Sequence, residues 1–142
     1  MDGGTYTLVL ERESDGPVEV GALGDVAFAA GWYAYTGSAL GPGGFSRVER
    51  HRAVARGDND ARHWHIDYLL GDDATSVDSV VTTAADIECA VAWRLADGVG
   101  GAVPDFGCSD CACASHLVGR ADREELVSAV ERAHDGAASE RG

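Results

Sequence analysis

The sequence predicts an α+β domain whose strands lie mainly in the first third of the chain and whose helices follow. In residues 4–11, Tyr6, Leu8 and Leu10 alternate with smaller side chains, which is the period of two of a strand with one buried face. Beyond residue 44, apolar residues recur at helical spacing. With 142 residues and 45% hydrophobic content, the chain is long enough for one domain with a single core.

The N-terminal strands are predicted to form an antiparallel meander. The sequence Asp-Gly-Pro at residues 15–17 is a turn signal, and residues 18–20 begin a second strand. Residues 26–30 lead into an aromatic strand that ends near Tyr35. We therefore expect the ends of these strands to present Tyr6 and Tyr35.

An arginine-rich helix is expected from about residue 44 to residue 56, where a Gly-Asp-Asn-Asp sequence ends it. Val48 belongs to its core stripe, and Arg47, Arg50 and His51 occupy the adjoining face. A guanidinium and an imidazole one turn apart suit a phosphate ester, because Arg is the preferred bidentate partner of phosphate oxygens. Taken alone, the same pattern also fits a solvated helix face.

The remaining elements are predicted from their periodicity and from their end signals. The Thr-x-x-Asp spacing at residues 83–86 resembles a capping box and predicts a helix start. The expected elements are a short helix at 68–70 capped by Asp67, a strand at 77–83, a helix from 83–86 to about 96, a last strand at 115–119, a helix at 122–134 and a frayed end at 137–142.

The charge of the chain is unusual. The net charge is −13, and all 11 basic residues are Arg. An acidic surface without Lys is typical of adaptation to a very salty cytosol, where screening makes self-repulsion tolerable. The sequence has no apolar run of membrane-spanning length and no signal-peptide pattern, so we expect a soluble cytoplasmic protein with no membrane partner.

The basic residues are concentrated in one segment. Residues 47–62 contain five Arg and three acidic residues, which leaves a local charge of +2 before His51 is counted. At molar salt, phosphate contacts yield little free energy from counterion release. Binding of nucleic acid by this segment would therefore depend on a few well-placed contacts and on metal ions.

Six residues could together supply the chemistry of metal-assisted phosphodiester hydrolysis. That reaction needs a proton acceptor for water, a cation beside the developing phosphorane charge and a carboxylate for a divalent ion. Taken singly, each residue has a structural explanation, such as a Glu in the first turn of a helix. The set consists of Tyr6, Tyr35, Arg47, His51, His63 and Glu88.

The order of these residues resembles the GIY-YIG nuclease superfamily. The series comprises Gly4-x-Tyr6, then Tyr35-x-Gly37-Ser38, then Arg47-x-x-x-His51, then a glutamate on a later helix. Thr5 and Thr36 replace the isoleucines of the motif, and both are β-branched, so the strands are expected to persist. Residues 35–41, 50–52, 63–70, 88–89 and 110–117 resemble more narrowly the DUF123 branch of the superfamily, whose members occur alone or fused to endonuclease III-like repair enzymes.

The resemblance implies a fold and a set of roles. The fold would be a small antiparallel three-stranded sheet flanked by helices, with residues 1–120 as the domain and residues 121–142 as a helix and tail packed on it. Tyr6 would be the general base or its relay, Tyr35 would position water or phosphate, Arg47 would stabilise the transition state with His51 or His63 assisting, and Glu88 would hold a single Mg²⁺ or Mn²⁺. The expected contacts with nucleic acid come from Arg50, Arg52, Gly37 and Ser38.

The cysteine cluster Cys108-x-x-Cys111-x-Cys113-x-x-His116 has two interpretations. Thiolates and imidazole are ligands that suit Zn²⁺, so the cluster could be a zinc site. Alternatively, the thiols are small buried groups and His116 is hydrogen-bonded in the core or borders the active site.

Together these features predict a metal-dependent endonuclease that hydrolyses DNA phosphodiester bonds in repair. The expected partners are nucleic acid, DNA rather than RNA, and a repair protein such as an endonuclease III-like glycosylase. Two alternatives stay open at this point: a nucleic-acid-binding module that does not cut, and a zinc-stabilised interaction protein.

Overall fold

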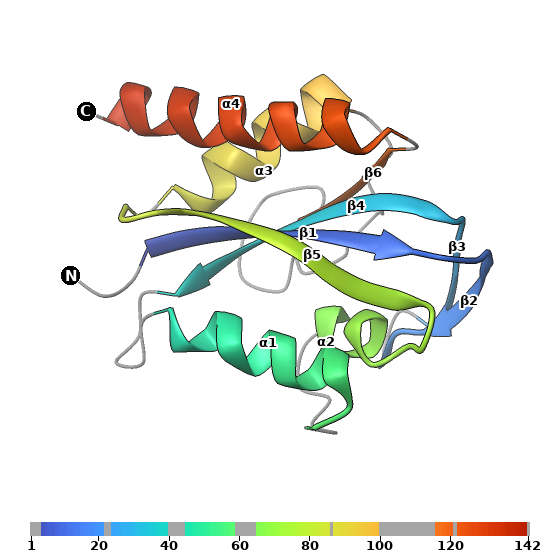
Figure 1. Cartoon of the computed structure of the whole chain (residues 1–142). Helices are drawn as coiled ribbons and strands as arrows, with labels where there is room; N and C mark the ends of the chain where they lie inside the picture. The colour runs from blue at the N-terminus through green and yellow to red at the C-terminus, as the bar shows by residue number, and fades with distance from the viewer. Residues whose placement is uncertain are drawn as a thin grey trace.

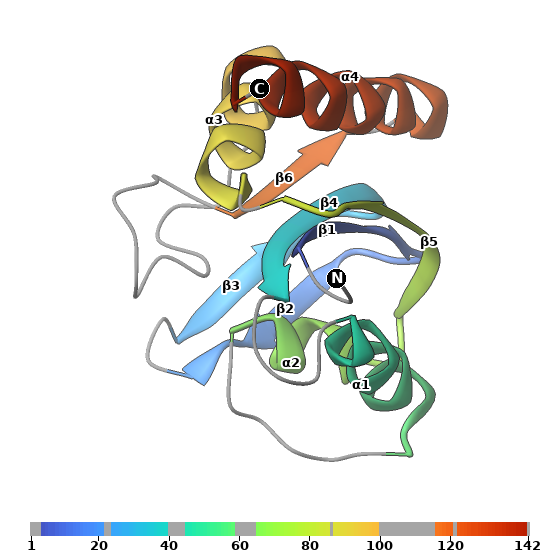
Figure 2. The same cartoon turned by 90° about the vertical axis from the view of Figure 1, so that its left-hand side faces the viewer.

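A central antiparallel sheet lies between two pairs of helices. The computed structural model describes residues 4–21, 24–39, 45–58, 65–85, 87–99, 116–120 and 122–141. Helices α1 and α2 cover one face of the sheet, and α3 and α4 cover the other (Figure 1). The view turned by 90° shows the same layers (Figure 2). The α+β class predicted from the sequence is therefore confirmed.

Within the described residues, the sheet has four strands in the order β5-β1-β4-β6, not the three that we expected. The fourth is β6, which pairs with β4 as an antiparallel edge strand. The central pair of β1 and β4 sets Tyr6 opposite Gly37 and Leu8 opposite Tyr35. The strands of this sheet are β1 (Gly4–Arg12), β4 (Gly31–Ala39), β5 (Thr75–Thr83) and β6 (Leu117–Arg120).

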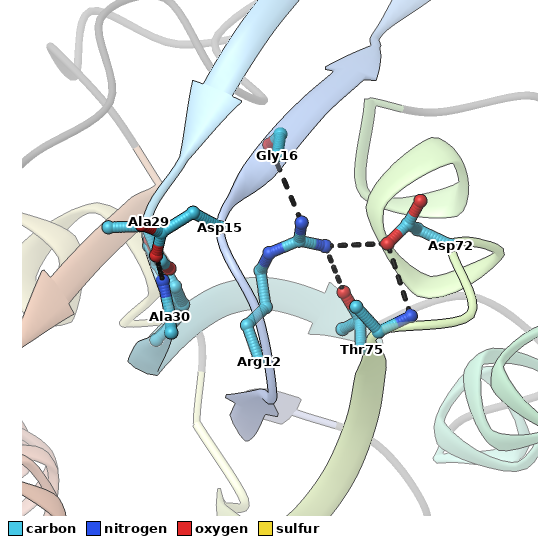
Figure 3. Close-up of polar contacts among 9 residues, drawn as sticks. Arg12, Asp15, Gly16, Ala29, Ala30, Asp72 and Thr75 are labelled. Carbon is cyan, nitrogen blue, oxygen red and sulfur yellow. Dashed lines mark hydrogen bonds and ion pairs between the residues drawn. The ribbon is translucent and has the colours of Figure 1, made fainter.

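The meander prediction was wrong, because β1 pairs with β4 and β5 instead of with the next strand in sequence. Strands β2 (Gly16–Glu19) and β3 (Asp25–Phe28) form a separate hairpin. The buried guanidinium of Arg12 joins this hairpin to the main sheet: Nη1 donates to Asp72 Oδ2 at 2.8 Å and to Thr75 Oγ1 at 2.7 Å, and Nη2 lies 3.5 Å from the Gly16 carbonyl (Figure 3). The buried Arg12 side chain therefore links the start of the β2–β3 hairpin to the turn before β5 and to the first residue of β5.

Both faces of β1 are buried, whereas the alternation predicted only one buried face. Tyr6, Leu8 and Leu10 belong to the core under α1 and α2. Val9 belongs to a second core under α3 and α4. The threonines on this second face of β1 can be buried because their hydroxyls are hydrogen-bonded within the protein. Their polar side chains therefore did not indicate a solvent-exposed face.

A hydrogen-bonded group of threonines and one histidine ties α4 to the sheet. His134 Nε2 contacts Thr7 Oγ1 at 2.8 Å, and His134 Nδ1 contacts Thr83 Oγ1 at 2.8 Å. Thr7 Oγ1 is also 3.0 Å from Thr36 Oγ1. Each ring nitrogen of a buried histidine therefore has a partner, as buried polar groups require.

The helices are α1 (Ser46–Arg56), α2 (His65–Leu70), α3 (Glu88–Val99) and α4 (Arg123–Arg141). Helix α1 agrees with its prediction and ends at Gly57, whose φ of 82° is the left-handed conformation of a helix C-terminus. Asp67 lies inside α2 and does not cap it, which corrects our expectation. Among the described residues, no helix has the length and the apolar character needed to cross a membrane.

Two helix boundaries differ from prediction. Helix α3 begins at Glu88, because Thr83 is still in β5 and the hydroxyl of Thr5 accepts a hydrogen bond from the Ile87 amide at 3.0 Å. Helix α4 continues to Arg141, so the fraying expected from residue 137 was wrong: Ala137 is buried in the second core.

Candidate functional site

The centre of the candidate site is a buried contact between Tyr6 on β1 and His51 on α1. Tyr6 Oη lies 2.6 Å from His51 Nε2, and the two residues are only 2% and 1% exposed. The sequence placed His51 on a helix face beside the core stripe, but the structure buries it in the stripe itself with Val48 and Val54. A short contact between two such groups is well suited to moving a proton.

Tyr35 and Gly37 on β4 complete the wall around this contact. The Tyr35 ring meets the His51 ring edge to face, with centroids 6.3 Å apart. A Cβ on Gly37 would lie 2.4 Å from the Tyr6 hydroxyl. Gly37, which was predicted to contact nucleic acid, therefore has a packing role: it leaves the space that the Tyr6 hydroxyl occupies.

Two arginines of α1 hold the helix against its neighbours. Arg47 Nη1 donates to the carbonyl oxygen of Ser38 at 2.7 Å, which joins α1 to the end of β4. Arg50 forms a bidentate pair with Asp67 on α2, at 2.9 and 3.0 Å. The Asp67 carboxylate is fully buried, and the Arg50 side chain is 22% exposed. The structure thus places Arg50, a predicted nucleic-acid contact, in an internal ion pair.

Arg52 is the most accessible of the predicted contacts on α1 that the structure describes. Its Nε is 3.9 Å from Glu49 Oε1; the Arg52 side chain is 38% exposed and that of Glu49 is 75% exposed. Exposed pairs of this kind contribute about 0–1 kcal/mol and exchange partners readily. Arg52 can therefore meet an incoming phosphate, whereas Arg50 is committed to Asp67.

Glu88 is the first residue of α3, the helix that begins on the opposite face of the sheet. Its carboxylate Oε2 lies 3.3 Å from Nδ1 of His116, a residue directly before β6. The sequence analysis assigned Glu88 to Mg²⁺ or Mn²⁺ and left His116 with two interpretations, a zinc ligand or a core residue that borders the active site. Only the pairing of β4 with β6 brings them together, and no local sequence signal predicts that.

The ionisation of the two tyrosines connects Glu88 to the centre of the site. Burial raises the pKa of Tyr6 above its usual value, the positive charge of Arg47 lowers it, and the negative charge of Glu88 raises it. Burial likewise raises the pKa of Tyr35, with a further increase from Tyr6 and Glu88. Both tyrosines are neutral at physiological pH, and added positive charge near Glu88 would favour their ionised forms.

His51 is neutral as well. Burial is the main reason that its pKa falls to about 4, and the nearby Asp67 carboxylate only partly offsets that decrease. A neutral imidazole has one nitrogen that accepts and one that donates a hydrogen bond. The Tyr6–His51 pair is therefore a contact between two uncharged groups.

The stability of the fold should fall as the pH falls below 6.5. The pKa of His51 is about 4 in the folded chain and 6.5 for an unperturbed histidine, so between these values the unfolded chain binds more protons and stability rises with pH. The contribution is fully present above pH 6.5 and amounts to about 2 kcal/mol between pH 5 and pH 7.5. His134, whose pKa is also lowered by burial, acts in the same direction.

Urea unfolding at pH 5 and pH 7.5 measures this loss, and NMR titration of the ring protons assigns it. The His51 ring should remain neutral down to about pH 5. A His51 resonance that titrates near pH 6.5 would contradict the burial argument.

Several predicted residues lie outside the described ranges: His63, Cys108, Cys111 and Cys113. Of the predicted zinc ligands, the structure therefore describes only His116, whose ring faces Glu88. Within the part of the chain that is described, no three His, Cys, Asp or Glu side chains gather as a metal-binding group.

The fold and the site define the chain as a layered α+β protein with a buried tyrosine–histidine pair and a flanking carboxylate. A family model described as "Domain of unknown function DUF123" matches residues 5–139, and the chain belongs to that family. The match includes most of α4, so this helix is part of the family domain. No curated protein and no solved structure matches the chain.

Proposed function

We propose that this protein is a metal-dependent endonuclease of the GIY-YIG type that hydrolyses phosphodiester bonds in DNA. The observation that carries the proposal is the 2.6 Å contact between the Tyr6 hydroxyl and His51 Nε2. It joins the first tyrosine of the motif to the histidine that follows the motif arginine. Tyr35 and Arg47, which come from two other parts of the motif, lie around the same contact.

In the proposed mechanism, Tyr6 works as a proton relay. A tyrosine whose pKa is raised by burial is not ionised at neutral pH, so Tyr6 cannot act as a base unaided. Neutral His51 has a lone pair available at Nε2 when its proton is on Nδ1. Tyr6 can therefore pass its proton to His51 as it takes one from the attacking water.

Positive charge is needed where the phosphorane forms. Arg47 is the cation whose charge acts most strongly on the Tyr6 hydroxyl, and its guanidinium suits a phosphate oxygen. The Tyr35 hydroxyl interacts electrostatically with Tyr6, Glu88 and Arg47, and it would orient the water or a phosphate oxygen. Arg52, on the exposed side of α1, would contact the phosphate backbone.

The oxygen ligands available at the site fit a hard divalent cation that is held mainly by phosphate oxygens of the DNA substrate. Mg²⁺ commonly binds through one or two carboxylates, several waters and substrate phosphates, and Glu88 supplies one carboxylate that is 24% exposed. When bound there, Mg²⁺ or Mn²⁺ would supply positive charge to a phosphate oxygen and favour ionisation of the tyrosines. The protein's part is to keep the Glu88 carboxylate within range of Tyr6 and Tyr35.

The proposed setting is DNA repair in a salty cytosol. An acidic chain with net charge −13 repels nucleic acid except where its arginines gather, so contact should be restricted to the α1 side. The proposed partner is a repair protein such as an endonuclease III-like glycosylase.

The proposal is tested with labelled linear, flapped, branched and single-stranded DNA at molar KCl, with Mg²⁺ or Mn²⁺. Wild-type protein should cut at least one substrate, and Glu88→Ala and Arg47→Ala should each lose cleavage and keep the fold, as judged by circular dichroism. Arg123→Ala is a suitable control, because Arg123 lies on α4, on the other face of the sheet from α1, and pairs with Asp78. Full activity in both site variants would reject the mechanism, and DNA binding without any cleavage would favour the non-cutting module.

A further inference from the structure

We infer that His116 is a positioning residue that holds the Glu88 carboxylate for a divalent cation. The inference rests on the proposed function and adds a residue that the motif does not contain. Nδ1 of His116 lies 3.3 Å from Oε2 of Glu88. In the proposed arrangement this contact fixes the carboxylate, and Oε1 is the oxygen that would face the cation.

Each member of the pair is anchored to a strand that carries a site tyrosine. The carbonyl oxygen of His116 accepts a hydrogen bond from the Thr36 amide at 2.9 Å, one residue after Tyr35. At the start of α3, the Thr5 hydroxyl donates to the Ala85 carbonyl at 2.8 Å and accepts from the Ile87 amide. Thr5 directly precedes Tyr6. The strands β1 and β4 therefore fix Glu88 and His116 relative to both tyrosines.

The burial of the two side chains indicates that His116 positions Glu88 and not the reverse. The His116 side chain is 4% exposed, whereas that of Glu88 is 24% exposed and can meet solvent or an ion. A glutamate in the first turn of a helix otherwise loses rotamer entropy when it is fixed in one orientation. A buried imidazole beside one oxygen removes part of that freedom before the cation arrives.

Such a contact has a known chemical consequence at metal sites. Ligating carboxylates are themselves hydrogen-bonded, and loss of the outer partner typically weakens metal affinity or activity 10–100-fold. The requirement is strongest when the protein provides few ligands. Among the described residues, Glu88 and Asp67 are the two acidic groups whose charges raise the pKa of both Tyr6 and Tyr35. Asp67 is already paired with Arg50, so we assign the cation to Glu88.

The experiment measures Mn²⁺ affinity directly, by the loss of the free Mn²⁺ signal in electron paramagnetic resonance, and records DNA cleavage in parallel. His116→Leu should weaken Mn²⁺ binding about 10–100-fold. His116→Asn should recover most of it, because an asparagine amide can donate from about the position of Nδ1. The double variant His116→Leu/Glu88→Gln should bind Mn²⁺ about as weakly as Glu88→Gln alone, because in Glu88→Gln His116 no longer has a carboxylate to position.

His134→Leu is the matched control. His134 is also buried, on the side of α4 that faces the sheet, but its ring contacts Thr7 and Thr83 and not Glu88. It should leave Mn²⁺ affinity unchanged where the variant is folded. Equal affinity in wild type and folded His116→Leu, with Glu88→Gln defective, would overturn the inference and leave the nuclease proposal standing. Absence of Mn²⁺ binding by the wild type would overturn the inference, and absence of metal-dependent cleavage as well would also remove the nuclease proposal.

Two spectroscopic measurements on the wild type test the arrangement itself. Nitrogen NMR should find a proton on Nδ1 of His116, and a proton on Nε2 alone would overturn the inference. Pulsed electron paramagnetic resonance of bound Mn²⁺ should find no directly coordinated imidazole nitrogen. Such a nitrogen, assigned to His116 by its loss in His116→Asn, would make His116 a ligand and reject the positioning role.

Discussion

Tyr6→Phe should lower the rate of DNA cleavage by about 100- to 10,000-fold, the range typical for loss of a positioned proton-transfer group. The variant keeps the ring that fills the core under α1 and removes only the hydroxyl that lies 2.6 Å from His51 Nε2. Leaving that nitrogen without its tyrosine partner should cost about 1–3 kcal/mol of stability. Single-turnover cleavage with saturating metal measures the rate.

Tyr33→Phe is the control for this change. Tyr33 lies in the same core on β4, and its hydroxyl donates to the Ala29 carbonyl at 2.7 Å, away from His51. It should lose a hydrogen bond of comparable kind and keep the cleavage rate within a few-fold. Equal rates for Tyr6→Phe and the wild type would mean that the Tyr6–His51 contact is only part of the core.

Arg50→Met should destabilise the fold by about 3 kcal/mol. It removes the bidentate partner of Asp67, whose carboxylate is fully buried, and loss of one partner of a buried pair typically costs 3–5 kcal/mol. The lower end of that range applies because the Arg50 side chain is 22% exposed and water already reaches it. Urea unfolding at pH 7.5 measures the free energy.

The double variant Arg50→Met/Asp67→Leu separates charge from packing. Replacement of both partners by apolar residues is often close to neutral, so the double variant should recover most of the lost stability. Arg56→Met, which removes an exposed pair with Asp58, should change stability by less than about 1 kcal/mol. A loss of 1 kcal/mol or less in Arg50→Met would show that the Arg50–Asp67 pair contributes little to the fold. Weak DNA binding by a stable double variant would restore the role that the sequence suggested for Arg50.

Local sequence patterns predicted the elements whose ends depend on neighbouring residues. Helix α1 was found close to its expected range because Gly57 takes up the left-handed conformation that ends it. The strand predicted at 77–83 is β5, two residues longer at its start. Patterns failed where a distant partner set the boundary: Thr83 bonds to His134 on α4, and the hydroxyl that receives the Ile87 amide comes from Thr5 on β1.

The sequence by itself determined the α+β class, the family and the identity of the residues that bear the proposed chemistry, because those depend on residue type and order. The tertiary structure decided which of those residues meet. Pairing of β1 with β4 and packing of α1 on that pair bring Tyr6 to His51 and take Arg50 to Asp67. Pairing of β4 with β6 brings His116 to Glu88. These contacts join residues far apart along the chain, and periodicity reports only the face on which a side chain lies, not the partner that it meets there.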